Sequence, residues 1–432
     1  MKIWFMGVAL AAFLASCAPR KDAGVTLHFW ALGREGEVVK DIIPEFERRN
    51  PGIRVEVQQI PFVNAHEKFL TACVGGVTPD LAQVGNTWIP ELANLGALRP
   101  LGGLLRRSST IAPADYFPGI WDTNVIAGTV RGIPWYVDTR LLFYRTDLLA
   151  QAGYPSPPRT WSGWLEAMRR VKARRPDRFA ILLPVDEHEQ LQILGRELGA
   201  GLLRDGDRYG DFRSAAFRRA ATFYVDLYRS GLAPAWSNSQ VNSVYQQFAA
   251  GDFAFYITGP WNIGEFRRRL PPEMQDKWQT APMPAPDGSG PSAAWPGVSL
   301  AGGASLALFR TSRHPQEAWK LVEYLSSPAV QVQFHRLTGD LPARKSAWQD
   351  PELAGDRPTA AFRAQLERVV PAPKVPEWEE ICIQMWQSLE PAIRSGGTVD
   401  AALADLDRRV DRILEKRREV LARNAGRISG GR

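Results

Sequence analysis

Segments of alternating and of helical hydrophobic pattern follow one another along the first part of the chain. Residues 25–30, 53–57 and 79–84 are short, β-rich runs that predict strands. Between them, apolar residues recur at helical spacing and predict helices over 37–50 and 65–74. Strands that alternate with helices in this way indicate an α/β sheet with parallel strands.

Helical patterns dominate the rest of the chain. A Pro- and Gly-rich stretch at 282–296 predicts a loop or a crossing between domains. Thr160 or Ser162 can cap the helix that starts near 161. The pattern predicts short strands over 253–257 and 305–309, and helices over 161–175, 213–230, 243–250, 315–326, 328–337 and, as one long charged amphipathic segment, 399–418.

The N-terminus carries an export signal. Lys2 precedes an apolar run over 3–15 that is shorter than the roughly 20 residues of a membrane-spanning helix. The run ends in Leu14-Ala15-Ser16-Cys17, which resembles the lipobox of bacterial lipoproteins. We therefore expect a lipoprotein signal peptide over 1–16, lipidation of Cys17 and a tether over 17–24. The alternative is an ordinary signal peptide that contains a cysteine.

Composition narrows the classes of protein further. A chain of 432 residues more plausibly holds two domains than one, and it can bury a core without disulfides. Beyond Cys17 only Cys73 and Cys382 remain, and the sequence leaves open whether they pair. The net charge of +7 is spread along the chain, so we expect no nucleic-acid partner. Neither a cofactor motif nor a metal-ligand spacing among the five His residues is present.

Several motifs, in order along nearly the whole chain, resemble the extracellular solute-binding protein family of the maltose-receptor type. Each motif is short, and the resemblance rests on their order and spacing. They are Phe29-Trp30 with Pro51-Gly52, Gly75-Gly76-Val77-Thr78-Pro79-Asp80, residues 132–140 followed by 143–149, Thr160-Trp161, residues 248–251 with Gly259-Pro260-Trp261, and Gly339-Asp340-Leu341-Pro342-Ala343.

The resemblance implies a two-lobed α/β fold, each lobe a mainly parallel sheet flanked by helices, with a solute-binding cleft between the lobes. Crossings near Tyr136, Pro296 and Pro342 would make both lobes discontinuous. We expect the first lobe over 25–136 and 297–341, and the second over 137–296 and 342–432. The resemblance further implies an exported, membrane-anchored monomer that faces the periplasm or the extracellular side and delivers a sugar or polyol to the permease of an ABC importer.

The resemblance also suggests solute contacts. Asp138 and Glu187 lie where the family places acidic sugar contacts, and Trp261 matches its stacking tryptophan. Aromatic rings suit the C–H faces of a sugar, and polar side chains suit its hydroxyls. The 15 Trp residues offer many such rings, although Trp161, Trp164 and Trp319 sit in apolar helix patterns and belong to the core.

Further candidates follow predicted strands or crossings, because open α/β sheets bind ligands at the carboxyl ends of their strands. Trp30 and Tyr136 have an alternative role in packing. Maltose receptors are expected to have an acidic residue at the turn where this chain has Arg34. An anionic solute, such as a glycerol phosphate, therefore remains an alternative to a sugar. These candidates are Trp30, Arg34, Glu35, Asn86, Thr87, Trp88, Tyr136 and Trp295.

An exported carbohydrate-active enzyme is the main alternative. Asp138 and Glu187 would then serve as the two carboxylates of a glycoside hydrolase. A serine nucleophile is not indicated, because Gly297-Val298-Ser299-Leu300-Ala301-Gly302 has one residue too many for the Gly-x-Ser-x-Gly turn. The sequence favours a binding protein over an enzyme, and a purely structural lipoprotein is a weaker third reading.

Overall fold

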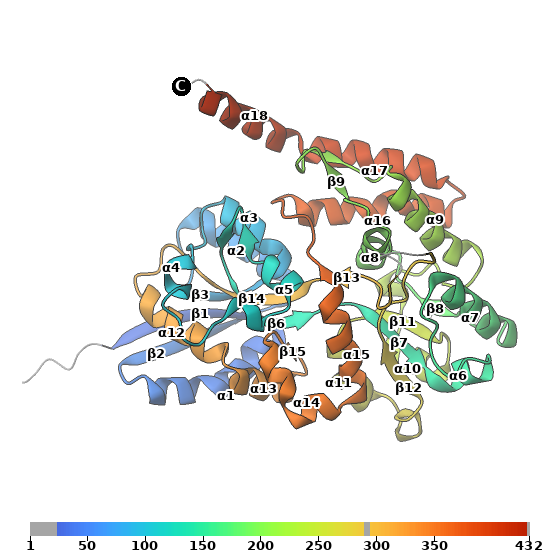
Figure 1. Cartoon of the computed structure of the whole chain (residues 1–432), viewed down its shortest axis with the longest axis horizontal. Helices are drawn as coiled ribbons and strands as arrows, with labels where there is room; N and C mark the ends of the chain where they lie inside the picture. Colours follow the sequence, from blue (N-terminus) through green and yellow to red (C-terminus); the bar gives the residue numbers. More distant parts are fainter. Residues whose placement is uncertain (1–23, 289–293, 430–432) are drawn as a thin grey trace, which may run out of the picture.

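Two separate β-sheets organise the molecule, and each is covered by helices to form a lobe (Figure 1). The computed structural model describes residues 24–288 and 294–429. The predicted signal peptide, the lipidation site Cys17 and the tether up to residue 23 therefore lie outside the described residues. Within the described residues, no helix combines the length and the apolar character needed to cross a membrane.

The first lobe is built on a six-stranded mixed sheet. Strands β2, β1 and β3 run parallel, as the alternating sequence pattern predicts. The other three strands pair antiparallel, because each follows or precedes a passage between the lobes rather than a helical crossover within one lobe. In spatial order the strands are β15 (Leu341–Pro342), β6 (Ile133–Asp138), β14 (Gly302–Leu308), β3 (Leu81–Gly85), β1 (Val25–Leu32) and β2 (Ile53–Ile60).

The second lobe holds a four-stranded sheet that is also mixed. Only β11 and β8 pair in parallel, so the expectation of mainly parallel sheets holds for part of each sheet. In spatial order the strands are β12 (Trp278–Ala281), β7 (Leu141–Arg145), β11 (Phe255–Thr258) and β8 (Ile181–Leu182). Two small hairpins lie outside the sheets: β4 (Val125–Ile126) with β5 (Thr129–Val130), and β9 (Leu203–Arg204) with β10 (Tyr209–Gly210).

Helices cover both sheets. The first lobe carries α1 (Gly33–Arg49), α2 (Phe62–Gly75), α3 (Ile89–Asn94), α4 (Gly102–Leu105), α5 (Pro118–Asp122), α12 (Pro315–Leu325) and α13 (Pro328–Thr338). The second carries α6 (Thr146–Gln151), α7 (Trp161–Arg174), α8 (Glu189–Glu197), α9 (Ala215–Arg229), α10 (Val244–Ala250), α11 (Trp261–Arg269), α16 (Trp378–Arg394), α17 (Val399–Ile413) and α18 (Glu415–Ser429). The short helices α14 (Pro351–Gly355) and α15 (Arg357–Gln365) lie between the lobes in Figure 1.

Several segments link the two lobes. The chain leaves the first sheet after β6, returns before β14 and leaves again after β15. Two linking segments run side by side, since β13 (Ser299–Leu300) pairs in parallel with β16 (Val369–Val370). Helix α5 packs closely on β16: a Cβ at Gly119 would lie 2.2 Å from the carbonyl oxygen of Val369. Glycine is therefore required at this contact between the first lobe and a linking segment.

Apolar side chains fill both lobes and the region between them. One core runs from the first sheet, through Trp348 and Phe362, to Phe143 on the second sheet. A second core lies under α7, α9, α16 and α17, and a third packs α2 and α3 on the first sheet. Trp161, Trp164 and Trp319 are buried, as their helical patterns predict.

Most predicted elements are present, but the predicted C-terminal helix over 399–418 is wrong. The structure has two helices, α17 and α18, that meet at Leu414, where ψ is 2° and the side chain is fully buried. Anchoring Leu414 in the core of the second lobe interrupts the helix, and α18 then extends away from the body (Figure 1). Thr160 caps α7, as expected, by accepting a hydrogen bond from the Gly163 amide at 3.2 Å.

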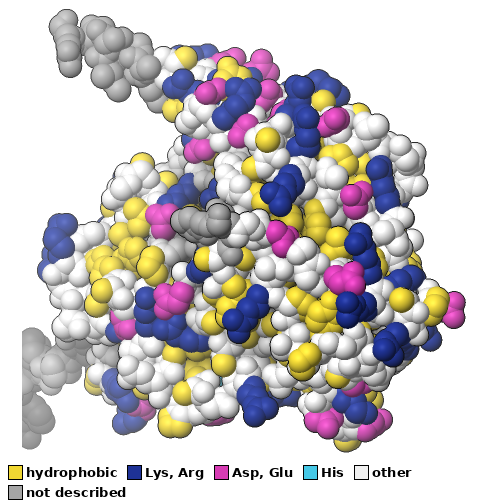
Figure 2. All heavy atoms as spheres, turned by 45° about the vertical axis from the view of Figure 1, so that its right-hand side comes forward, with side chains coloured by type: hydrophobic (Ala, Val, Ile, Leu, Met, Phe, Trp, Pro, Cys, Tyr) yellow, Lys and Arg dark blue, Asp and Glu magenta, His cyan; other side chains and the backbone are white. Residues whose placement is uncertain are grey.

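Charged side chains of both signs are interspersed over the described surface that Figure 2 shows. The arginine run 267–269 illustrates the pattern, because Arg267 pairs with Asp356 while Arg268 and Arg269 pair with Glu265. These pairs neutralise the arginine run locally, so the run does not form an uncompensated basic patch.

Candidate functional site

A cavity of about 290 Å³ lies between the two lobes. The first lobe contributes the turn after β3, the end of β6 and the start of β14, while α8 and α16 close it from the second lobe. Its walls combine aromatic rings, carboxylates and amides: Phe62, Asn86, Thr87, Trp88, Asp138, Thr139, Arg140, His188, Glu189, Gln192, Leu300, Ala301, Gly302, Gly303, Ala372, Trp378, Glu379 and Cys382, with Gly85 beneath them.

Arg140 joins the two lobes at the centre of this site. It lies in the two-residue passage between β6 and β7, directly after Asp138, the last residue of β6. Its Nη1 donates to both carboxylate oxygens of Asp138 at 2.9 and 2.8 Å, and its Nη2 donates to Glu189 Oε1, at the start of α8, at 3.0 Å. The guanidinium carbon also lies 4.6 Å from the ring centroid of Trp261, the first residue of α11.

These contacts and burial set the protonation of the surrounding carboxyls. Burial raises the pKa of Asp138 although Arg140 opposes that shift. Burial would also raise the pKa of Glu189, but Arg140 and His188 outweigh it and lower the pKa to about 2. Burial and the Glu189 carboxylate raise the pKa of Glu187, which accepts a hydrogen bond from Gln190. Glu189 is therefore charged. The neighbouring carboxyls of Asp138 and Glu187 would be stabilised by a proton or by a ligand that donates a hydrogen bond.

Two polar atoms in the cavity wall have no partner. Thr139 Oγ1 and Gln192 Oε1 are buried without a hydrogen bond. The Nε2 of Gln192 is engaged, since it bonds to His188 Nδ1 at 2.5 Å and to Cys382 Sγ at 3.6 Å. Buried polar groups are rarely left unsatisfied, so these atoms are suited to a ligand that brings hydroxyl or amine groups.

The turn after β3 shapes the first-lobe wall. Asn86 donates to the Gly302 carbonyl at 3.1 Å and accepts from Ser305 Oγ at 2.8 Å, so its amide ties this turn to β14. Trp88 packs against Phe62, with the ring centroids 5.6 Å apart and the ring planes tilted by 43°. The ring of Phe62 is more than half exposed and forms the rim of the cavity.

The structure brings together Asn86, Thr87, Trp88 and Asp138 of the sequence-predicted contacts in the wall of this cavity. Trp261 lies next to the cavity, because its ring contacts the guanidinium of Arg140. Glu187 is also near, since Arg140 and Glu189 both affect its pKa. Six of the eleven predicted contacts thus lie in one region that both lobes form.

Three predicted residues lie elsewhere. Trp30 packs on Phe69, with ring centroids 5.7 Å apart, and lines a shallow depression beside β2. Trp295 lies beneath Arg159, whose guanidinium carbon is 4.4 Å from the ring centroid. Arg34 donates to the Leu337 carbonyl at 3.0 Å. All three side chains are thereby held outside the cavity wall.

Glu35 and Tyr136 belong to a second polar cluster in the first lobe. The Tyr136 hydroxyl accepts a hydrogen bond from Gln83 Nε2 at 3.0 Å, while Gln83 Oε1 accepts from the Leu32 amide at 2.8 Å. Burial and the neighbouring Glu35 carboxyl raise the pKa of Asp340, and burial raises that of Glu35. Each of these two carboxyls therefore affects the protonation of the other.

Sequence reasoning missed several lining residues. Arg140 stood within the quoted 132–140 motif, two residues from Asp138, and its position in a predicted crossing was the available signal. Glu189 and Gln192 face the cavity from α8, a helix that the pattern did not predict. Trp378 and Glu379 open α16, which was also not predicted, so no local signal assigned them to the site.

Comparison with known proteins identifies the family. The family described as "bacterial extracellular solute-binding protein" matches this chain over residues 30–332. The chain belongs to this family. It is similar to the solved structure of the sugar-binding protein MalE from Xanthomonas citri, with 49% identity, a TM-score of 0.88, and coverage of 92% of this chain and 99% of that one.

Two curated relatives add to the comparison of this solute-binding protein. An uncharacterized lipoprotein of Streptomyces antibioticus is 27% identical, with 86% of this chain and 84% of the relative covered. The galactooligosaccharide-binding protein of Bacillus subtilis (strain 168) is 22% identical, with 98% of each chain covered. The chain therefore spans nearly the full length of a binding protein.

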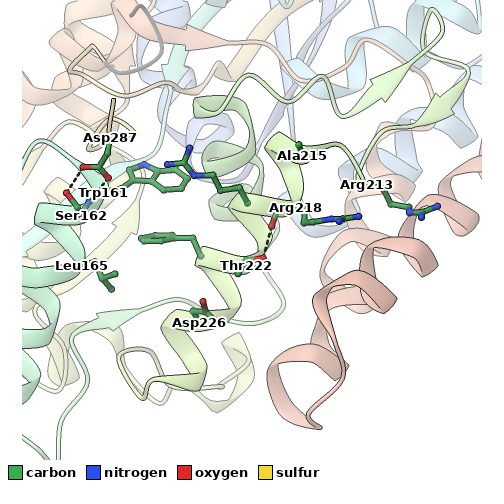
Figure 3. Close-up of a pocket in the computed structure, with 11 residues that line it drawn as sticks. Trp161, Ser162, Leu165, Arg213, Ala215, Arg218, Thr222, Asp226 and Asp287 are labelled. Atoms are coloured by element: carbon green, nitrogen blue, oxygen red, sulfur yellow. Dashed lines mark hydrogen bonds between the residues drawn. The ribbon is translucent and has the colours of Figure 1, made fainter. Parts of the chain in front are cut away.

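The solute-binding protein has a second and larger hollow, of about 660 Å³, on the outside of the second lobe (Figure 3). Helices α7 and α9 form its sides, with Trp161 at the base and Arg218, Thr222 and Asp226 along one wall. Asp287 is already bonded to the Ser162 amide and hydroxyl at the start of α7. This hollow belongs to one lobe and consists largely of exposed side chains, so closure of the lobes would not enclose a ligand there.

The described residues contain no cluster of His, Cys, Asp and Glu side chains that could hold a metal ion. Cys73 and Cys382 are both free thiols, and burial raises the pKa of each. The residues that line the interlobe cavity offer hydrogen bonds, charges and aromatic rings.

Proposed function

We propose that this chain captures a sugar in the cavity between its lobes and delivers it to the permease of an ABC importer. The observation that carries the proposal is the composition of that cavity. Aromatic rings at Phe62 and Trp88 line this cavity together with carboxylates and with two polar atoms without partners. A sugar offers C–H faces to the rings and hydroxyls to the polar atoms.

The relatives support a sugar as the solute. The 49% identical Xanthomonas citri protein is a sugar-binding protein, and the Bacillus subtilis relative is a galactooligosaccharide-binding protein. We propose Trp261, Asp138, Glu187, Asn86, Thr87 and Trp88 as solute contacts, and we add Arg140, Glu189 and Gln192. The lobe boundaries expected above, 25–136 with 297–341 and 137–296 with 342–432, are part of this proposal, with the first lobe extended to Asp138 and to Pro342 because β6 and β15 run to those residues.

A thermal-shift screen followed by calorimetry tests the capture of a sugar. The screen covers mono-, di- and oligosaccharides, polyols and glycerol phosphates. We expect a sugar to raise the melting temperature, because a ligand that binds only the folded state stabilises it. We also expect chromatography to recover that sugar unchanged. Release of a product would instead support a hydrolase, and stabilisation by glycerol phosphates alone would contradict the proposal.

We further propose that the mature protein is held on a membrane through a lipidated Cys17. The segment Leu14-Ala15-Ser16-Cys17 and the lipoprotein relative of Streptomyces antibioticus support this anchor. More than one acyl chain is needed for stable anchoring, which a multiply acylated cysteine would supply. Fractionation of cells that produce the Cys17→Ser variant should move the protein from the membrane to the soluble fraction. Retention of that variant in the membrane would contradict the anchor.

A further inference from the structure

The charges around the interlobe cavity are strongly one-sided. Asp138, Glu189 and Glu379 line it, and Glu187 lies beside Glu189. Among the lining residues that the structure describes, Arg140 is the lone Lys or Arg. The site thus gathers four carboxyls around one guanidinium.

That guanidinium is already engaged. It bonds to both oxygens of Asp138 and to one oxygen of Glu189, and its side chain is only 18% exposed. An anionic ligand would have to displace one of these carboxylates to reach Arg140. His188, the other lining side chain that can carry a positive charge, is engaged with the Gln192 amide through its Nδ1.

The neighbouring polar cluster adds further carboxyls on the side of the first lobe. Asp340 is 7% exposed, its Oδ2 has no partner, and it lies close enough to Asp138 for the two to repel. Glu35 adjoins Asp340, and Arg34, which donates to the Leu337 carbonyl, partly offsets the effect of burial on Glu35. Burial disfavours the charged form of both of these carboxyls, so the negative charge that meets a ligand comes chiefly from the cavity wall.

Resting on the proposed capture of a sugar, we propose that this cleft selects by charge: it admits uncharged or amine-bearing sugars and rejects sugars that carry a phosphate or a carboxylate. Closure of the lobes would strip water from an anionic group and leave it among carboxyls without a free cation, which is a costly arrangement. The cavity-wall atoms that lack partners fit the same class, because Thr139 Oγ1 and Gln192 Oε1 can accept hydrogen bonds from hydroxyls or amines.

Calorimetry with matched sugars tests this selection. The probes are glucose, galactose, maltose and cellobiose, each compared with its 6-phosphate, together with glucosamine. We expect every phosphate to bind at least about tenfold more weakly than its parent sugar, and glucosamine to bind no more weakly than glucose. Higher salt should reduce the difference in affinity between a sugar and its phosphate, since salt screens the repulsion between the phosphate and the carboxylates.

Variants of α16 show whether the carboxyls cause the discrimination. Glu379→Gln removes one negative charge from the cavity wall. It should reduce the ratio of affinities between the parent sugar and its phosphate several-fold. Glu380→Gln is the matched control, because Glu380 is the next residue of the same helix and is exposed outside the wall. An equal effect of both variants would contradict a local origin of the selection.

The outcomes separate this inference from the function on which it rests. If parent sugars and phosphates bind equally well, sugar capture stands and selection by charge is wrong. If phosphates bind more tightly, selection has the opposite sign and the inference is also wrong. If no probe binds at all, the capture of a sugar fails, and the inference falls with it.

Discussion

At the scale of single residues, Arg140 organises the site. It connects Asp138, at the end of a first-lobe strand, with Glu189, at the start of a second-lobe helix. A buried ion pair of this kind contributes little net stability when it is intact, but loss of one partner is costly. The sequence indicated Asp138 as a contact and not its partners, because the pairing of residues 49 positions apart depends on the tertiary fold.

The depressed pKa of Glu189 predicts a specific acid sensitivity. The folded-state pKa is about 2, below the ordinary value of 4.5, so charged Glu189 stabilises the protein above about pH 4.5 and loses this effect as the pH falls toward 2. The contribution is roughly 3 kcal/mol at neutral pH. Denaturant unfolding should show that the advantage of wild type over Glu189→Gln shrinks between pH 6 and pH 3. A difference that does not change with pH would contradict the ion pair.

Two tryptophans offer a matched test of the cleft. Trp261 and Trp295 are each 39% exposed, and each lies beneath an arginine, but only Trp261 adjoins the cavity. Trp261→Ala should weaken binding of the sugar roughly fivefold or more, because loss of a stacking ring costs at least about 1 kcal/mol. Calorimetry on Trp295→Ala should give unchanged affinity. Equal effects of the two substitutions would refute the assignment of Trp261.

At the scale of elements, the hydrophobic pattern predicted those helices and strands whose own sequence is amphipathic or alternating. The amphipathic helices α1, α7, α9 and α12, and the alternating strands β1 and β2, appear close to their predicted bounds. The break between α17 and α18 was missed because Leu414 continues the helical pattern in sequence while tertiary packing buries it and turns the chain. Helices α8 and α16, which line the cavity, were also missed, and so the second-lobe wall was not predicted.

The contact of α5 with β16 yields a prediction for a linking segment. Gly119→Ala would place a Cβ 2.2 Å from the Val369 carbonyl oxygen, so either α5 or the linking strand must shift. We expect a loss of about 1–3 kcal/mol in the free energy of unfolding, measured with denaturant. Gly103→Ala is the control, because a Cβ there meets open space. Similar losses in both variants would show that the close approach is unimportant.

At the scale of the whole molecule, the fold was predictable because the motifs are distributed over the chain. Their order predicted two lobes, and the structure has two sheets joined by several linking segments (Figure 1). The mixed strand directions were not predicted, since periodicity does not distinguish parallel from antiparallel pairing. The side-by-side linking strands β13 and β16 fit the hinge closure known for binding proteins of two lobes.

The central claim is that a sugar binds between the lobes, and a crystal structure of the complex with the tightest-binding sugar tests it most directly. The account predicts the sugar in the interlobe cavity, in contact with Asp138 or Glu189 and with at least one of Phe62, Trp88 and Trp261. A sugar seated in the hollow between α7 and α9, with the interlobe cavity unchanged, would contradict it.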